Sequence, residues 1–300
     1  MADRVHELQP VRQTPVTTGR RHRLLRYSNE LGRYALMVLL ALVFLLPIAW
    51  LFISSVRPAA TVFEHTTRPG IRTFVPESLT LENYQVALAS PDFRRAIRNS
   101  LIVSLSTVLL GVLVNSLAGF AFAVFEFPGR RILFAIVLAT FMMPFEAIVI
   151  PLYIIIRAFG WTDSFQALIL PAVANGLVIF LFRQFLAQIP RDIYEAAKID
   201  GASWIQIYTQ IAMPLAWPTI VTASLMLFLQ QWDAFFWPLV AASAPEYVVI
   251  QVAVARNITY EETHWGTLFS MTSIAVLVPM VFYLFAQRYY MRTIVMSGIK

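Results

Sequence analysis

Long apolar stretches separated by short polar segments are the main pattern along this chain. A helix needs about 20 apolar residues to cross a bilayer core of roughly 30 Å. Six stretches meet this requirement, and they cover residues 34–56, 100–125, 132–156, 165–186, 214–241 and 266–287. The pattern therefore predicts an all-α membrane protein with six transmembrane helices. The first stretch is too long for a signal peptide, and no small-residue cleavage site follows it.

The polar segments around these stretches predict how the chain is organised. Residues 1–33 form a polar N-terminal tail, residues 34–288 the transmembrane domain, and residues 289–300 a short C-terminal tail. The longest connection, 57–98, contains four prolines and is too short for an independent domain.

The composition supports the membrane interpretation. Only 13% of the residues are charged and the mean hydropathy is +0.67, whereas about a quarter of the residues of a globular domain are charged. The chain has no cysteine, which excludes a disulfide framework, a thiol nucleophile and a cysteine-based metal site.

The net charge of +6 comes almost entirely from arginine, because only Lys198 and Lys300 among the 23 basic residues are lysines. A basic chain can bind nucleic acid, but here the basic residues separate apolar stretches instead of forming one soluble face. Positive-inside topology accounts for them better. With an N-terminus inside, fifteen basic residues fall in inner segments and eight in outer ones. We therefore expect cytoplasmic N- and C-termini and no nucleic-acid partner.

Several catalytic chemistries are missing from the sequence. Neither lysine lies in the Gly-Lys-Ser/Thr context of a P-loop, so this chain cannot hydrolyse nucleotide by that route. The four histidines all lie outside the predicted helices, so neither an HExxH zinc site nor a buried Ser-His dyad is available. We predict no catalytic residue, no metal site and no cofactor in this chain.

The polar segment between the fourth and fifth stretches carries the most specific local pattern. Pro190 and Asp192 favour a helix start, and strong helix formers follow from Glu195. Gly201 can adopt the positive φ of a helix C-terminus. A second short helix is expected from about Ser203 to residue 212. The segment thus predicts a pair of short helices that projects from the cytoplasmic side.

This segment resembles the EAA motif of the permease subunits of binding-protein-dependent ABC importers, most closely the maltose-type second subunit of the carbohydrate branch. Further similar segments extend over nearly the whole chain. They include Asn99-Ser100, Phe127–Arg130, Met142–Pro144, Trp232–Pro238 and Ser297–Lys300.

The resemblance implies a type I ABC importer permease fold in a prokaryotic inner membrane. It implies a homologous permease as heterodimer partner, two copies of a cytoplasmic ATPase that binds ATP and Mg, and an extracytoplasmic substrate-binding protein. The EAA loop, 189–214, would couple this chain to the ATPase. Its expected coupling residues are Glu195, Ala196, Ala197, Asp200, Gly201, Ile211 and Pro214.

Polar side chains inside the predicted helices are candidates for a substrate pathway, because such groups are costly in lipid. Gln230, Asp233 and Trp237 would share one face of a continuous helix, and an amide, a carboxylate and an indole suit a sugar. Glu146, Asn115 and Asn175 are further candidates. The structural alternative is that these groups form hydrogen bonds between helices.

Three other functions remain open from the sequence. A proton-coupled secondary transporter would use Glu146 or Asp233, but no repeated pair of broken helices supports it. An intramembrane enzyme would need a carboxylate or histidine dyad near the membrane surface. An ABC permease of the same branch could carry glycerol-phosphate compounds or amino sugars in place of a di- or oligosaccharide.

Overall fold

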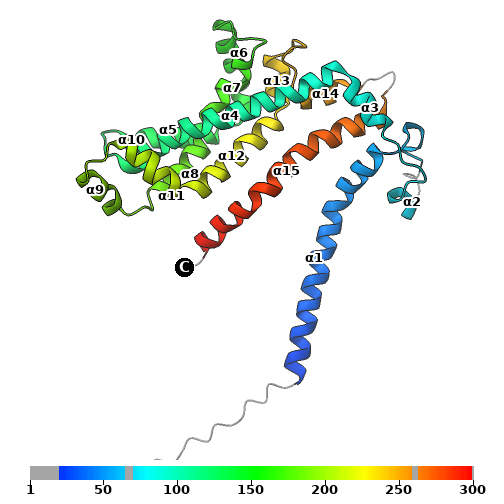
Figure 1. Ribbon diagram of the computed structural model, residues 1–300, viewed down its shortest axis with the longest axis horizontal. Coiled ribbons are helices and arrows are strands. Elements are labelled where there is room, and N and C mark those ends of the chain that lie inside the picture. The colour runs from blue at the N-terminus through cyan, green and yellow to red at the C-terminus, as the bar shows by residue number, and fades with distance from the viewer. Residues whose placement is uncertain (1–19, 65–69, 259–262, 299–300) are drawn as a thin grey trace, which may run out of the picture. The chain divides into compact units, whose positions relative to one another are not determined.

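The computed structural model describes residues 20–64, 70–258 and 263–298, and these residues form helices and connecting loops without a strand (Figure 1). The chain divides into two units, residues 1–50 and 51–300, within helix α1 (Arg20–Ser55). The predicted C-terminal tail lies partly outside the described residues, as does most of the N-terminal one.

Helix α1 is apolar on all sides over its membrane-spanning part. The most apolar 18 residues within Glu30–Ser55 have a mean hydropathy of 2.9, and the large side chains from Leu36 to Leu46 are exposed. A helix that is hydrophobic all round suits a lipid environment. The first predicted span is therefore present as one helix.

The second unit is organised around α4 (Pro91–Val124). This helix packs against α7 (Phe165–Val173), α8 (Gly176–Leu186), α12 (Trp217–Trp232) and α14 (Ile250–Arg256). α4, α12 and α15 (Trp265–Gly298) run side by side (Figure 1). Gly119 of α4 lies against α8, where an added Cβ would be 2.5 Å from the Phe182 side chain. Glycine is needed at this crossing because no larger residue fits between the helices. The other helices of this unit are η1 (Ala59–Thr61), α2 (Ile71–Phe74), α3 (Glu82–Ala89), α5 (Arg130–Met142), α6 (Phe145–Ala158), α9 (Arg191–Ile199), α10 (Trp204–Gln206), η2 (Ile207–Ala212), α11 (Met213–Leu215) and α13 (Phe236–Ala241).

Several predicted spans are broken rather than continuous. Four helical segments of the described chain are long and apolar enough to cross a membrane, and counting each of two bent pairs as one span gives up to six. The predicted span 132–156 consists of α5 and α6, bent by 103°. The predicted span 214–241 bends by 80° next to Ala216 and ends as a continuous helix at Trp232.

Prolines explain these breaks. Pro144, Pro218 and Pro238 lie at or just inside the start of the helix that follows each break. A proline ring fixes φ, removes the amide donor and disfavours a helical conformation at the preceding residue. The apolar length that predicts a span does not show where it breaks, whereas these prolines do.

Two tryptophans compensate for prolines that lie inside helices. A proline at position i leaves the carbonyl at i−4 without its helical donor. Pro279 in α15 frees the carbonyl of Ala275, and the Trp232 indole donates to that oxygen at 2.8 Å. Pro171 in α7 likewise frees the carbonyl of Ala167, which accepts from the Trp237 indole at 2.9 Å.

The segment around α14 is held to α4 by two side chains of the Asn99-Ser100 pair. The Asn99 amide donates to the carbonyls of Glu246 and Val248, and the Ser100 hydroxyl accepts from the amide of Ile250. Both side chains are buried. The pair therefore fixes a loop whose backbone has no helical partners of its own.

Candidate functional site

The segment 189–214 forms the expected pair of short helices, at the end of α4 away from α3 and α14 (Figure 1). Helix α9 begins after Pro190, with Asp192 in its first turn and Lys198 in its last. Both charges complement the helix dipole. Gly201 ends the helix with φ of +83°, and an added Cβ there would meet nothing within 4 Å. The glycine is required by backbone conformation and not by packing.

The second half of the segment begins with a capping box. The Ser203 amide donates to the Gln206 side chain at 2.7 Å, and the Gln206 amide donates to the Ser203 hydroxyl at 3.3 Å. One π-helical turn, η2, then leads into α11. Helical structure therefore continues from Trp204 to Leu215, close to the predicted range.

Aromatic side chains fasten the segment to the end of α4. Phe120 makes edge contacts with Tyr194 of α9 and Tyr208 of η2. The Tyr208 hydroxyl also hydrogen-bonds Ser116 at 2.7 Å, and Phe125 packs edge-on against Trp204. Tyr194 is 6% exposed, and burial raises the pKa of its phenol. We call this anchored helix pair, residues 189–214, the coupling knob.

Some of the predicted coupling residues are exposed on the knob, and others pack inside it. Glu195, Ala196, Asp200, Gly201 and Pro214 are exposed, whereas Ala197 and Ile211 pack against the buried cluster beneath. Residues of the first group can meet a partner, and those of the second support the knob from inside.

Two isoleucines that the sequence analysis did not single out also project from the knob. Ile199 is 87% exposed and Ile205 is 75% exposed, on either side of the Gly201 turn. Exposed apolar side chains at a protein tip are typical of an interaction surface. The available signal was the position of an isoleucine on each side of a helix-ending glycine.

A second candidate region is a cavity of about 540 Å³ bordered by the ends of α5, α7 and α12. Asn175 and Gln230 lie on its wall, and the Asn175 amide donates to the Gln230 side chain at 3.0 Å. Trp237 and Phe145 contribute aromatic surface. An apolar cavity with a few convergent polar groups has the character of a small-molecule pathway.

Asn115 does not line this cavity, in contrast to the expectation from the sequence. It is fully buried and its amide donates to the carbonyls of Gly111 and Val173. Its side-chain oxygen accepts from the amide of Asn175 at 2.8 Å. Asn115 thus satisfies backbone groups at the break between α7 and α8, as the structural alternative supposed.

Gln230, Asp233 and Trp237 do not share one helix face. α12 ends at Trp232 and α13 begins at Phe236, so Trp237 does not continue the helix that carries Gln230. Asp233 is exposed and accepts a hydrogen bond from Gln251 at 3.4 Å. Glu146 is exposed at the start of α6. Gln230 and Trp237 still share the cavity, whereas neither carboxylate borders it.

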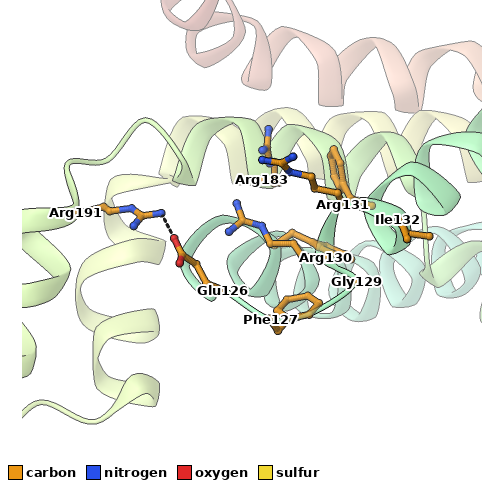
Figure 2. A pocket seen from close by; sticks show the side chains of 10 residues that line it. Glu126, Phe127, Gly129, Arg130, Arg131, Ile132, Arg183 and Arg191 are labelled. Atoms are coloured by element: carbon orange, nitrogen blue, oxygen red, sulfur yellow. Dashed lines mark hydrogen bonds and ion pairs between the residues drawn. The ribbon is translucent and has the colours of Figure 1, made fainter.

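A third candidate region is a hollow bordered by the α4–α5 loop, the start of α5, α8 and the start of α9 (Figure 2). Its volume is about 770 Å³, and four arginines line it together with one carboxylate. The Arg191 guanidinium donates to Glu126 at 2.7 Å, and this hydrogen bond and charge hold the pKa of Glu126 below its usual value. From the sequence, these arginines were assigned to topology and, in Phe127–Arg130, to the family resemblance, but not to a site. We call this hollow the arginine pocket; its charged residues are Glu126, Arg130, Arg131, Arg183 and Arg191.

Among the described residues, no cluster of three or more histidine, aspartate or glutamate side chains could hold a metal ion.

Comparisons with known proteins agree with these features. The model of the family described as "Binding-protein-dependent transport system inner membrane component" matches residues 109–295. A probable ABC transporter permease protein of Pyrococcus horikoshii is 34% identical, covering 87% of this chain and 96% of that protein. An arabinooligosaccharides transport system permease protein of Bacillus subtilis is 27% identical over 92% of this chain and its own full length.

A similar solved structure is that of a bacterial ABC transporter involved in the import of the acidic polysaccharide alginate. One of its chains superimposes with a TM-score of 0.78 at 22% identity, covering 92% of this chain and 100% of that one. This similarity establishes the ABC importer permease fold of the present chain.

Proposed function

Because this chain belongs to the family of binding-protein-dependent transport system inner membrane components, we propose that it is a permease subunit of an ATP-driven importer for a carbohydrate. Permease subunits of ABC importers are not themselves catalytic. The fold is that of an ABC importer permease, and the named function of the arabinooligosaccharide relative supports a di- or oligosaccharide as cargo.

The coupling knob is the observation that carries this proposal. Aromatic contacts join the knob's helices α9 and η2 to α4, while Ile199 and Ile205 beside the Gly201 turn remain exposed. A stiff projection of this kind can move as one body when a partner pushes on it. A separate cytoplasmic ATPase would receive the exposed tip, with Glu195, Ile199 and Ile205 as contacts.

The same proposal assigns an orientation and partners. The knob and both termini would face the cytoplasm of a prokaryotic cell, in accordance with the excess of basic residues in the inner segments. A homologous permease would complete the pathway, two ATPase copies would bind ATP and Mg, and an extracytoplasmic binding protein would deliver the sugar. No cofactor is assigned to this chain.

The cavity beside Asn175 and Gln230 would form this chain's part of the sugar pathway. Its amides can exchange hydrogen bonds with hydroxyl groups, and its aromatic wall can pack on the apolar face of a sugar ring. Trp237 would contribute its ring face alone, because its indole N–H is already bound to Ala167.

Two glycine substitutions test the coupling role. Gly201→Ala and Gly160→Ala each place a Cβ at positive φ in open space, so each costs about 1–2 kcal/mol of backbone strain. Only Gly201 lies on the coupling knob. We expect the Gly201 variant to lose sugar uptake and the stimulation of ATPase activity by liganded binding protein.

The measurement uses the complex that co-purifies with the full-length chain, reconstituted in lipid vesicles. Gly160→Ala should retain both activities and be expressed at the same level. Equal uptake by the two variants would contradict the coupling assignment. Uptake by the chain alone that an uncoupler abolishes and ATP does not affect would contradict the importer proposal itself.

A further inference from the structure

We propose that the arginine pocket binds the phosphate group of an anionic membrane phospholipid. This site lies outside the cavity and the coupling surface discussed above, although it borders the coupling knob through Glu126 and Arg191. The proposal does not depend on the nature of the transported substrate.

The charge balance of the arginine pocket favours an anion. Four guanidinium groups line it and Glu126 is its single carboxylate. That carboxylate is bound to Arg191, and among the described residues no salt bridge reaches Arg130, Arg131 or Arg183. Like charges gathered in one hollow repel one another unless a counter-ion occupies it. Guanidinium groups suit this role, because their planar donor forks bind phosphate in a bidentate manner.

Two of these arginines are held in place by groups that do not neutralise them. The Arg130 guanidinium donates to the carbonyl of Phe125 at 3.0 Å, and the Arg183 guanidinium lies 5.0 Å above the ring of Phe134. Each remains free to offer its other donors to a ligand. The geometry is therefore prepared before a ligand arrives, which lowers the entropic cost of binding.

The other walls of the arginine pocket favour a lipid over a free anion. Phe122, Phe127 and Phe134 supply an aromatic lining, and Ile132 at the start of α5 is 67% exposed. In Figure 2 the Glu126–Arg191 pair lies at one end of the labelled residues and Ile132 at the other. The exposed apolar face continues along α5 through Ile136. An amphiphile can thus place its phosphate among the arginines and its acyl chains along α5, as basic pockets between membrane helices do.

Native mass spectrometry of the delipidated full-length protein tests this inference. The probes are a phosphatidylglycerol and a phosphatidylcholine with identical acyl chains. We expect the wild type to prefer the anionic lipid, and Arg131→Gln/Arg183→Gln to weaken its binding more than about tenfold, because each lost charged hydrogen bond contributes at least about a factor of ten. Arg72→Gln/Arg157→Gln removes the same charge outside the pocket and should retain the preference.

A lysine variant distinguishes the loss of charge from a loss of folding. Arg131→Lys/Arg183→Lys keeps the charges and should retain part of the preference, and circular dichroism checks the helix content of every variant. An unchanged lipid preference in the glutamine variant would overturn the proposal. So would binding of inorganic phosphate that depends on these arginines without any preference between the two lipids. Loss of ATPase co-purification with unchanged lipid binding would instead assign the arginine pocket to a protein partner.

Discussion

The indole of Trp232 takes the place of a backbone donor that Pro279 removes from α15. The carbonyl of Ala275 is buried, and the indole N–H donates to it at 2.8 Å. Trp232→Phe keeps an aromatic ring beside Phe228 but deletes this donor. A buried carbonyl left without a donor costs about 1–3 kcal/mol. The smaller phenyl ring also leaves a void, so the total loss of stability includes a packing contribution.

A double-mutant cycle separates the hydrogen bond from the packing contribution. Pro279→Ala restores a helical amide that can donate to the Ala275 carbonyl, so this oxygen no longer depends on Trp232. The void left by Trp232→Phe is the same in both backgrounds. We therefore expect Trp232→Phe to cost about 1–2 kcal/mol less in the Pro279→Ala protein than in the wild type.

The free energy of unfolding would be measured for all four proteins in mixed detergent micelles, by circular dichroism during titration with a denaturing detergent. Phe282→Leu is a suitable control, because Phe282 stacks on Phe228 without bonding Ala275. Its cost should be the same with and without Pro279→Ala. Strict additivity of Trp232→Phe and Pro279→Ala would refute the compensation of proline by tryptophan.

Three further predictions follow from buried contacts, each checked by the same unfolding assay. Asn115→Ala leaves two backbone groups at the α7–α8 break unsatisfied, one of them the Val173 carbonyl, and should cost about 2–5 kcal/mol. Gly119→Ala should cost about 1–3 kcal/mol through overpacking against α8, whereas Gly32→Ala in α1, with open space around it, should not destabilise. Burial raises the pKa of Tyr194, so ionisation of its phenol opposes folding. The contribution of Tyr194 to stability should be constant below a pH of about 10 and fall above it, and Tyr194→Phe should reduce that fall.

Helix content, the coupling knob and the turn at Gly201 could be predicted from the sequence because each depends on local signals. Apolar length marks a span, and a glycine after Lys198 and Ile199 marks a helix end. Apolar length does not locate the breaks within the predicted spans, although prolines mark them. Whether a proline begins a new helix or lies inside one is not decided locally: Pro144 precedes α6, whereas Pro279 lies inside α15, where a distant indole bonds the carbonyl that it frees.

The cavity was only partly predictable, because its polar residues come from distant parts of the sequence. Asn175 and Gln230 meet across helices that are 55 residues apart in sequence, and no helical period predicts such a contact. The expected face of Gln230, Asp233 and Trp237 assumed a continuous helix, and the break after Trp232 removes it. The arginine pocket was missed because its arginines come from three separate segments, each of which had already been explained by topology.

Three helix ends border the cavity, so main-chain polar groups contribute to its wall. The last carbonyls and first amides of a helix have no partners within it, and such groups belong to the main chain. Met143, Ala174 and Ala234 mark these ends along the cavity wall. Side-chain substitutions leave main-chain groups in place, so alanine scanning would underestimate the polarity of the cavity. Moving a proline that sets a helix end would shift these main-chain groups, whereas replacing individual wall residues would not.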